Sequence, residues 1–413
     1  MAADLRHILA AFLTIAMFAM LGNMIKRDHF DAFQVSIQVQ SNTHVMKYKK
    51  KGSTTLLSKG LWQKDSMPLK ECWIKPTPIV QEAKKSNGFI VFSLSNGPEY
   101  HMSQVMDAVV IARFLGATLI VPDIRGSEPG QKKKLQDMYD EEKFMRSLHG
   151  VIKIAKELPH EMTSKSPVVV SVPNQASEDY IERNIEPIFQ TTGYLRLATD
   201  FSSIHMKPRE KQNSDFYSTS CLAMFGSLEL KQEIQEVVKT MIERLRTLDQ
   251  TSNGRFLAVD LRVDILEKKI CKRSESIRRK TCYSAQEVAD FLKKMGFAGN
   301  TTIYLTQTWW HESLKFFKEM FPNTYTKDDL IPTEKKGHFF GPENVMLERA
   351  LDFSICSQGD AFVPAITGLF YGNVIGKRIV LGRTQTLVPS SPSPDHLSTY
   401  VVKKSHLAYS CYC

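Results

Sequence analysis

The feature that most constrains this fold is an alternation of short β-rich runs and helical runs that begins near residue 87. The apolar run GFIVFSLSNG has a strand pattern, VMDAVVIARFLGA has helical spacing, and TLIVPDI returns to a strand pattern. Strands that alternate with helices build parallel sheet covered by crossover helices, and ligands bind at the carboxyl ends of such strands. We therefore predict an α/β fold whose functional loops follow its strands.

The chain is long enough for two such lobes, because 413 residues exceed the size at which one hydrophobic core stops growing. A long amphipathic helix is predicted at residues 228–248, with Gly254 closing it. We place an N-terminal α/β lobe at 87–226 and a C-terminal α/β lobe at 227–413, both Rossmann-like. In the second half the pattern predicts strands at 255–261, 302–306, 361–363 and 378–381, and helices at 284–295, 311–320 and 367–375.

Composition and charge limit the classes of partner. Hydrophobic residues make up 42% of the chain and charged residues 24%, which is typical of a globular protein and not of a disordered one. The net charge is +10, but the only tight basic runs lie at 47–51 and 132–134. Charge this diffuse favours an anionic small ligand or a membrane surface over nucleic acid, and a solvated surface is its commonest cause.

The N-terminus contains an apolar segment. Residues 8–25 carry no charge and, at about 1.5 Å per residue, are long enough to cross most of a hydrocarbon layer. We predict a transmembrane anchor there, after a cytoplasmic tail at 1–7 and before a polar stem at 26–86. A cleaved signal peptide is the alternative, although no small-x-small cleavage site follows. The single N-glycosylation sequon, at Asn300, and seven cysteines outside this segment favour a lumenal body and a type II topology.

Asp260, Arg262 and Asp264 alternate at the end of the strand predicted at 255–261. A continued strand would place these three side chains on one face. Arginine offers a rigid fork of donors that suits a diphosphate, and its charge persists at any physiological pH. A structural ladder of salt bridges explains the same spacing, so the spacing alone leaves both interpretations open.

Two other loops carry groups suited to chemistry. After the first strand, Asn96 and Gly97 permit a sharp turn, and Glu99 and His101 are titratable groups ahead of a helix, able to act as a general base. Helix capping is the ordinary role of such a glutamate. Thr367 and Gly368 follow the strand at 361–363, where hydroxyl and N–H groups suit a phosphate, although a plain helix cap explains the threonine.

Several motifs are absent from the sequence. It contains no Asp-x-Asp triplet, no Gly-x-Ser-x-Gly and no Cys/His cluster with metal-ligand spacing, which argues against a hydrolase or a metal site. Trp309 and Trp310 are able to stack on a sugar, but paired tryptophans before a helix more often serve packing.

Long ordered stretches resemble the plant O-fucosyltransferase-like family of glycosyltransferases: GRFLAVDLRVD, MFPNTYTKDDL, ALDFSICSQGDAFVPAITG and the opening GFIVFSLSNG. The resemblance covers almost the entire chain. It implies a two-lobed GT-B-type fold, type II topology in the Golgi membrane, and an inverting transferase that needs no metal or other cofactor. The substrates would be a nucleotide sugar, possibly a GDP-sugar, and a polysaccharide or glycan acceptor.

The resemblance also implies roles for individual residues. Arg262 matches the family's arginine that grips the donor diphosphate, and Asp264 stands where the family has a glutamate. Cys271 and Cys282 resemble a cysteine pair, which predicts a disulfide. The donor-binding set carried over in this way is Asn96, Gly97, Arg262, Asp264, Asp360, Thr367 and Gly368.

The chain departs from the family pattern at two places. Asp260 stands where histidine is usual, so it puts a negative charge beside the expected diphosphate. Either Asp260 turns aside to pair with Arg262 or Lys268, or the site no longer turns over. The first loop keeps Asn96 and Gly97 but lacks the arginine that most members have, so it should hold the donor's charge less well unless a lysine or arginine from elsewhere replaces it.

Two hypotheses follow. In the first, the protein is an active Golgi glycosyltransferase of plant cell-wall mannan (glucomannan or galactomannan) biosynthesis, with Arg262 stabilising the leaving nucleoside diphosphate and Glu99 or His101 as the general base. In the second, it is a non-catalytic accessory partner that stabilises a mannan synthase. Nucleic-acid binding is excluded, because a lumenal body does not meet nucleic acid.

Overall fold

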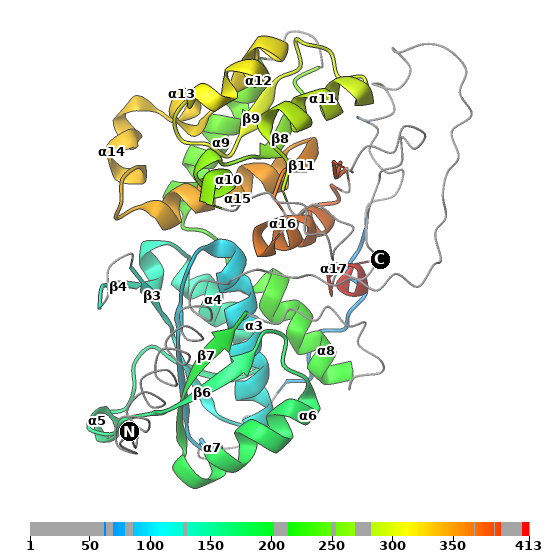
Figure 1. Ribbon diagram of the computed structural model, residues 1–413. Helices are drawn as coiled ribbons and strands as arrows, with labels where there is room; N and C mark the ends of the chain where they lie inside the picture. Colours follow the sequence, from blue (N-terminus) through cyan, green and yellow to red (C-terminus); the bar gives the residue numbers. More distant parts are fainter. Residues whose placement is uncertain are drawn as a thin grey trace, which may run out of the picture.

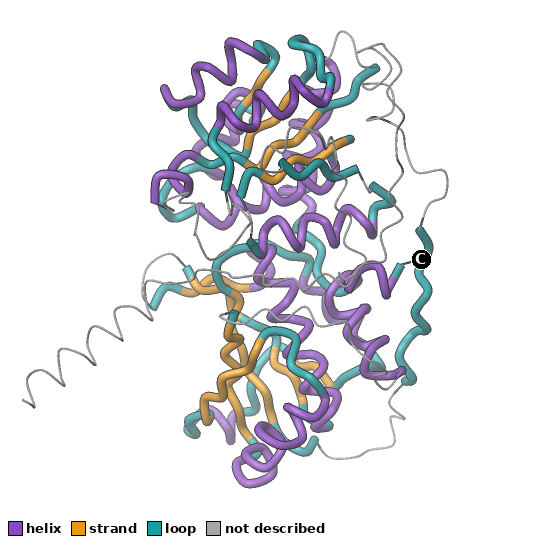
Figure 2. The backbone as a smooth tube through the Cα atoms, turned by 45° about the vertical axis from the view of Figure 1, so that its right-hand side comes forward, coloured by secondary structure: helices purple, strands orange, loops and turns teal. Residues whose placement is uncertain are grey.

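The computed structural model describes residues 62, 69–78, 86–126, 130–201, 214–248, 253–268, 282–366, 368–383, 385–389 and 407–412. These residues form two α/β lobes, one above the other, each built around its own sheet (Figure 1). In the tube view the strands of the two sheets occupy separate halves of the molecule, with helices between them (Figure 2). The two-lobed α/β architecture predicted from the alternation is therefore present.

The first lobe contains a seven-stranded mixed sheet in which β1 is central. β1 pairs in parallel with β7, and with β2 and β3 along successive stretches, whereas β4 pairs antiparallel with β3. Burial alternates along β1, as expected for a strand with one face more exposed than the other. The strands are β1 (Phe89–Leu94), β2 (Thr118–Ile120), β3 (Asp123–Arg125), β4 (Lys132–Lys134), β5 (Lys153–Ala155), β6 (Val168–Pro173) and β7 (Tyr194–Asp200).

Helix α3 (Pro98–Leu115) is buried along most of its length and contacts elements of both lobes. A helix that is apolar nearly all round belongs inside a protein, and α3 lies between the first sheet and the second lobe. It ends at Gly116, whose φ of 62° caps the helix in the left-handed conformation. The other helices of this lobe are α4 (Glu141–Leu148), α5 (His160–Thr163), α6 (Glu178–Tyr180), α7 (Glu186–Thr192) and α8 (Ser214–Cys221).

The second lobe contains an all-parallel sheet of four strands in the order β10-β9-β8-β11. All four residues of β8 are buried. Its three apolar residues alternate between two hydrophobic cores. Leu257 and Val259 belong to a core confined to this lobe, whereas Ala258 belongs to the larger core that continues into the first lobe. The strands are β8 (Leu257–Asp260), β9 (Ile303–Leu305), β10 (Thr324–Tyr325) and β11 (Ala361–Pro364).

The helices of the second lobe mostly follow the sequence pattern. The long helix predicted at 228–248 is α9 (Gln232–Thr247). The strand predicted at 378–381 is wrong, because α16 continues through Val380. Arg378 is fully buried there and donates to the carbonyls of Cys356 and Gly359. The apolar residues next to Arg378 in the sequence have the pattern of a short buried strand, which explains the wrong prediction. The remaining helices are α10 (Val263–Lys268), α11 (Ala285–Met295), α12 (Lys315–Met320), α13 (Lys327–Leu330), α14 (Lys336–Phe339), α15 (Val345–Gln358), α16 (Leu369–Val380) and α17 (Leu407–Cys411).

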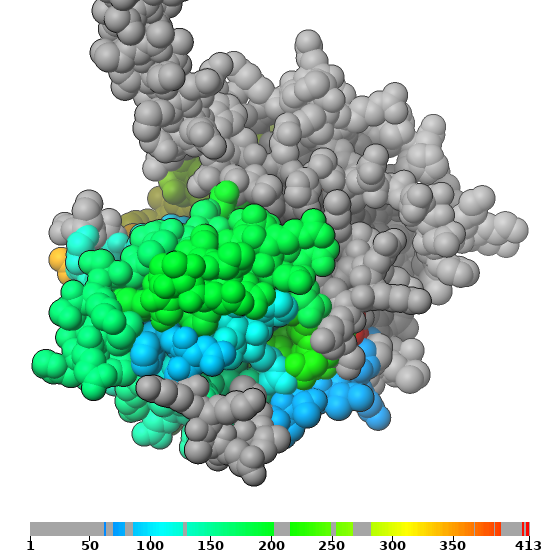
Figure 3. Space-filling model, turned by 90° about the horizontal axis from the view of Figure 1, so that it is seen from below, coloured from blue at the N-terminus to red at the C-terminus, as the bar shows by residue number. Residues whose placement is uncertain are grey.

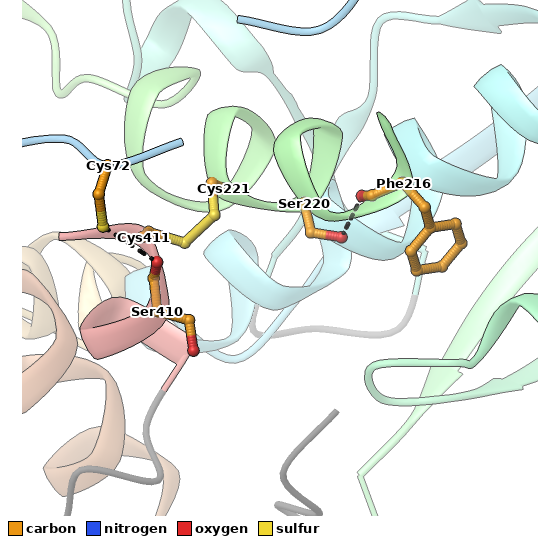
Figure 4. Close-up of a disulfide and its surroundings, with 6 residues drawn as sticks. All are labelled: Cys72, Phe216, Ser220, Cys221, Ser410 and Cys411. Carbon is orange, nitrogen blue, oxygen red and sulfur yellow. Dashed lines mark hydrogen bonds between the residues drawn. A yellow bond between two sulfur atoms is a disulfide. The ribbon is translucent and has the colours of Figure 1, made fainter. Parts of the chain in front are cut away.

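The end of the chain, predicted as part of the second lobe at 227–413, contacts both lobes, because α17 packs on α16 and on α8. A disulfide between Cys221 and Cys411 joins α17 to α8 (Figure 4). The backbone N–H of Cys72 donates to the carbonyl of Cys411. The segment 69–78, predicted as stem, is therefore bound to the folded body. Seen from below, the described surface comes mainly from segments that the bar colours blue to green (Figure 3).

The apolar segment at 8–25 lies outside the described residues. Within the part of the chain that the structure describes, no helix is both long and apolar enough to cross a membrane.

Candidate functional site

The carboxyl edge of the second sheet holds Arg262. β8 ends at Asp260 and α10 begins at Val263, so Arg262 occupies the turn between strand and helix. The prediction that Asp260, Arg262 and Asp264 share one strand face is therefore wrong. Asp264 lies in the first turn of α10, exposed to solvent, because the backbone turns before the alternation reaches it. Gln307 fixes this turn by accepting from the N–H of Val263.

The Arg262 side chain is held on two sides, and one of its donors makes no hydrogen bond within the described residues. Its Nε lies 3.3 Å from Oδ1 of Asp260, and its guanidinium carbon lies 5.1 Å from the centre of the Phe370 ring. The side chain is 13% exposed, and among the described residues its Nε makes no hydrogen bond. A guanidinium that is oriented by packing but short of acceptors is suited to bind an anion.

Asp260, which stands where the family resemblance predicts histidine, is buried and turned toward Arg262. Its Oδ1 accepts from the hydroxyl of Thr306 at 3.0 Å, and its Oδ2 has no partner among the described residues. Burial raises the pKa of Asp260, and the nearby charge of Asp352 adds to this, while Arg262 and Thr306 act in the opposite direction. The sequence left open whether Asp260 turns aside to pair with a cation. The structure shows that it does, because Asp260 pairs with Arg262.

A buried ion pair lies next to this edge and was not found from the sequence. Nζ of Lys327 donates to Oδ2 of Asp352 at 2.8 Å and to the carbonyl of Thr306 at 3.3 Å. The hydroxyl of Tyr304 donates to Oδ1 of the same aspartate at 2.7 Å. Sequence periodicity places a lysine on the surface, so it did not predict the burial of Lys327. The only related signal in the sequence was the Thr326–Asp329 capping pattern, which marks the start of α13 at Lys327.

The first loop approaches this region from the other lobe. Asn96 and Gly97 have φ values of 71° and 141°, so the sharp turn predicted there is present. Glu99 follows in the first turn of α3, fully buried, and its carboxylate pairs with Arg349 of α15. As a result Glu99 does not face solvent, where an acceptor hydroxyl would arrive.

His101 does not fit the role of general base. It is fully buried in α3, and its Nδ1 lies 2.7 Å from the hydroxyl of Tyr139. Burial lowers the pKa of His101 to about 3, so the imidazole is neutral at physiological pH. A base has to be within hydrogen-bond reach of the proton that it accepts, and this ring is enclosed by the core. The prediction of a catalytic His101 is corrected to a packing role.

The third predicted loop is only partly near Arg262. Gly368, with a φ of 154°, precedes α16, and Phe370 of the same helix packs on Arg262. Thr367 lies outside the described residues. Asp360 precedes β11 at the opposite, amino edge of the sheet, where it accepts from the backbone N–H of Phe256 and pairs with arginines. Asp360 is therefore removed from the donor-binding set, because it lies at the amino edge of the parallel sheet and Arg262 lies at the carboxyl edge.

The remaining predictions concern the surface. Asn300 is exposed in the turn after α11, which suits a glycosylated asparagine. Cys282 is disulfide-bonded, while Cys271, its predicted partner, lies outside the described residues. Trp310 donates to Asp329 and so has a packing role, whereas Trp309 is 56% exposed. Within the described parts of the chain, no three His, Cys, Asp or Glu side chains gather as metal ligands would.

Comparison with known proteins decides the family. The family model of GDP-fucose protein O-fucosyltransferases matches residues 90–381, which include both sheets and the Arg262 turn. The chain belongs to this family. Among curated proteins it is 47% identical to Protein MANNAN SYNTHESIS-RELATED 1 of Arabidopsis thaliana over 100% of both chains. It is also 43% identical to Protein MANNAN SYNTHESIS-RELATED of Trigonella foenum-graecum over 99% of both, and 26% identical to O-fucosyltransferase 11 of Arabidopsis thaliana over 74% of this chain and 59% of that protein.

Solved fucosyltransferase structures resemble this chain more distantly. POFUT1 in complex with GDP is 13% identical, with a TM-score of 0.45 over 74% of this chain and 99% of that one. NodZ alpha-1,6-fucosyltransferase soaked with GDP-fucose is 12% identical, with a TM-score of 0.45 over 76% and 98% of the two chains.

Proposed function

We propose that this protein is a glycosyltransferase that transfers a sugar from a nucleotide donor, a GDP-sugar, to a polysaccharide or glycan in plant mannan biosynthesis. The observation that carries the proposal is the Arg262 guanidinium at the carboxyl edge of the second sheet, oriented by Asp260 and Phe370 but short of acceptors. The family and the names of the full-length relatives support the reaction class and the mannan context.

In this proposal Arg262 binds the donor diphosphate and stabilises the negative charge that develops on it as the sugar leaves. An oriented cation in a poorly solvated site stabilises such charge more than water does. The acceptor hydroxyl oxygen bonds to the anomeric carbon from the opposite face as the bond from that carbon to the phosphate oxygen breaks, so the configuration inverts. The diphosphate leaves with the bonding electron pair, and the hydroxyl proton passes to water. The arginine takes the role that a divalent metal has in other transferases, so the proposed reaction is metal-independent.

We place the protein, as part of the same proposal, in the Golgi membrane as a type II protein with its body in the lumen. The apolar segment at 8–25 and the sequon at Asn300 support this topology, and the exposure of Asn300 is compatible with glycosylation. The Cys221–Cys411 disulfide also suits an oxidising compartment.

Calorimetry tests the donor step. Full-length protein is titrated with GDP-fucose, GDP-mannose and a UDP-sugar, and then with the same donors after Arg262→Met. We expect one GDP-sugar to bind, and the substitution to weaken it about 10- to 100-fold, the usual range for a lost charge-assisted hydrogen bond. If no nucleotide sugar binds the wild-type protein, the proposal fails.

One observation favours a second candidate, a non-catalytic partner that stabilises a mannan synthase. Both predicted bases, Glu99 and His101, are fully buried. A plant lacking this protein and complemented with Arg262→Ala separates the two candidates. Restored mannan content would favour the partner role, because a scaffold needs no diphosphate-binding cation, whereas unrestored mannan from a stably expressed variant favours the transferase.

A further inference from the structure

An ion pair connects the first loop to the second lobe. Arg349 extends from α15 to the carboxylate of Glu99 in the first turn of α3. Glu99 is fully buried, while the Arg349 side chain is 23% exposed, so one end of the guanidinium is held and another part remains accessible. The amide of Asn373 on α16 bonds to the Glu99 carbonyl at 2.5 Å, which fixes the glutamate backbone from the second lobe as well.

Gly97 is shaped around this pair. A Cβ at this position would lie 2.8 Å from Oε2 of Glu99 and 2.9 Å from Nε of Arg349, closer than side chains tolerate. Its φ of 141° is also a conformation that residues with a Cβ rarely adopt. The turn that the family resemblance assigns to donor binding is therefore packed directly on the arginine.

Arg349 keeps unused hydrogen-bond capacity. A guanidinium has five N–H donors, and a single carboxylate cannot satisfy all of them. The Nε of Arg349 makes no hydrogen bond among the described residues. Burial also lowers the pKa of Arg349, which shows that its charge is poorly solvated. An anion that reaches the exposed part of the Arg349 side chain would supply further acceptors.

One buried carboxylate, Asp352, acts electrostatically on Arg349 and on the partner of Arg262. Arg349 and Asp352 are three residues apart on α15 and so share a face of the helix. The charge of Asp352 acts on Arg349 and also on Asp260, the partner of Arg262. The three ion pairs linked in this way are Arg262 with Asp260, Lys327 with Asp352, and Arg349 with Glu99.

We propose that Arg349 is a second phosphate-binding cation for a nucleoside diphosphate, positioned by Glu99, and that it supplies the charge absent from the first loop. Glu99 is then a positioning residue and not a base. This inference rests on the proposed function, because it concerns the same donor. It accounts for the burial of Glu99, which a general base would not need. It also accounts for Gly97, because a side chain at that position would collide with Arg349.

The experiment measures binding of GDP to the full-length protein by calorimetry, with guanosine as the phosphate-free comparison. The variants are Arg349→Met, Arg349→Lys, Glu99→Gln and the double variant Glu99→Gln/Arg349→Met, which leaves no unpaired buried charge. Arg383→Met is the matched control, because it removes an arginine from the same lobe at the amino edge, beside Asp360. Thermal unfolding confirms that each variant is folded.

We expect Arg349→Met and the double variant to weaken GDP binding about 10- to 100-fold and to leave guanosine binding unchanged, the range for losing a hydrogen bond to a charged group. Arg349→Lys should recover part of this loss because it retains the charge. Glu99→Gln should weaken GDP binding less, because the cation stays but is no longer oriented. Arg383→Met should bind GDP as the wild-type protein does.

Other outcomes overturn the inference in distinguishable ways. If Arg262→Met loses GDP binding while the folded double variant retains wild-type affinity, the inference is wrong and the proposed function stands. If Glu99→Gln keeps GDP affinity but abolishes transfer, Glu99 is the base and its positioning role is wrong. If the wild-type protein binds no nucleoside diphosphate, both the inference and the proposed function fail.

Discussion

The two edges of the second sheet both combine aspartates with arginines, yet the two aspartates differ in how completely they are satisfied. At the amino edge Asp360 accepts from the N–H of Phe256 and pairs with Arg246 and Arg383. At the carboxyl edge Asp260 and Arg262 face each other, but Oδ2 of one and Nε of the other lack hydrogen bonds within the described residues.

The difference teaches how to separate structural from functional charge in this protein. Folded proteins satisfy nearly all buried polar groups, so groups left incomplete need an explanation, and a ligand is one such explanation. The family resemblance placed both Asp360 and Arg262 in the donor-binding set. Only Arg262 lies at the carboxyl end of a strand, where ligands bind in parallel sheets. The following predictions test this contrast, beginning with the largest expected effect.

Replacing Lys327 tests whether the carboxyl edge depends on its buried ion pair. Lys327→Met leaves Asp352 buried without its cation, and we expect the free energy of unfolding to fall by about 3–5 kcal/mol. Chemical denaturation measures this. Lys335→Met is the control, because its pair with Glu233 is exposed on both sides and should cost at most about 1 kcal/mol. Equal losses in the two variants would contradict the burial argument.

Replacing Arg262 tests the ligand-binding role of this edge. Arg262→Met should weaken GDP-sugar binding by about 1.5–3 kcal/mol, since the arginine would bond the diphosphate with charge-assisted hydrogen bonds. Arg383→Met, at the opposite edge, should leave the dissociation constant unchanged by calorimetry. Similar affinity losses in both variants would remove the functional distinction between the edges.

Replacing Asp360 tests the structural role of the amino edge. Asp360→Ala removes the acceptor of a backbone N–H and two arginines, so we expect the free energy of unfolding to fall by about 1–3 kcal/mol. Nucleotide-sugar binding should be unaffected once the protein is folded. A loss of binding with unchanged stability would return Asp360 to the donor site.

Titration of Asp260 gives the smallest expected effect. Its raised pKa means that the folded state binds more protons than the unfolded state above pH 3.8, so its contribution to stability falls as pH rises from there toward the folded pKa. The charged neighbours in this window are Arg262 and Asp352, with the Cys356 thiol also nearby. Asp260→Asn removes the titration, and urea unfolding at several pH values should show a weaker decline of stability with pH. An unchanged slope would contradict the raised pKa.

The fold was largely accessible from local pattern. Runs such as residues 88–97 and 255–261 are apolar enough to be strands, and the capping box of Ser284 and Glu287 marks the start of α11. The strand predicted at 378–381 failed because burial of Arg378 depends on distant carbonyls, which local pattern does not contain. The same limit hid the burial of Lys327.

In the candidate site, too, some features follow from local sequence and others depend on contacts between distant residues. The sequence by itself determined the two α/β lobes, the turn at Asn96–Gly97 and the position of Arg262 at a strand end, because these depend on short-range periodicity and backbone sterics. Only the tertiary structure decided that His101 is enclosed, that Asp360 lies at the far edge of the sheet, and that Glu99 meets Arg349. Such pairings join residues up to 250 positions apart, and their energies depend on burial and distance, which arise only when the lobes come together.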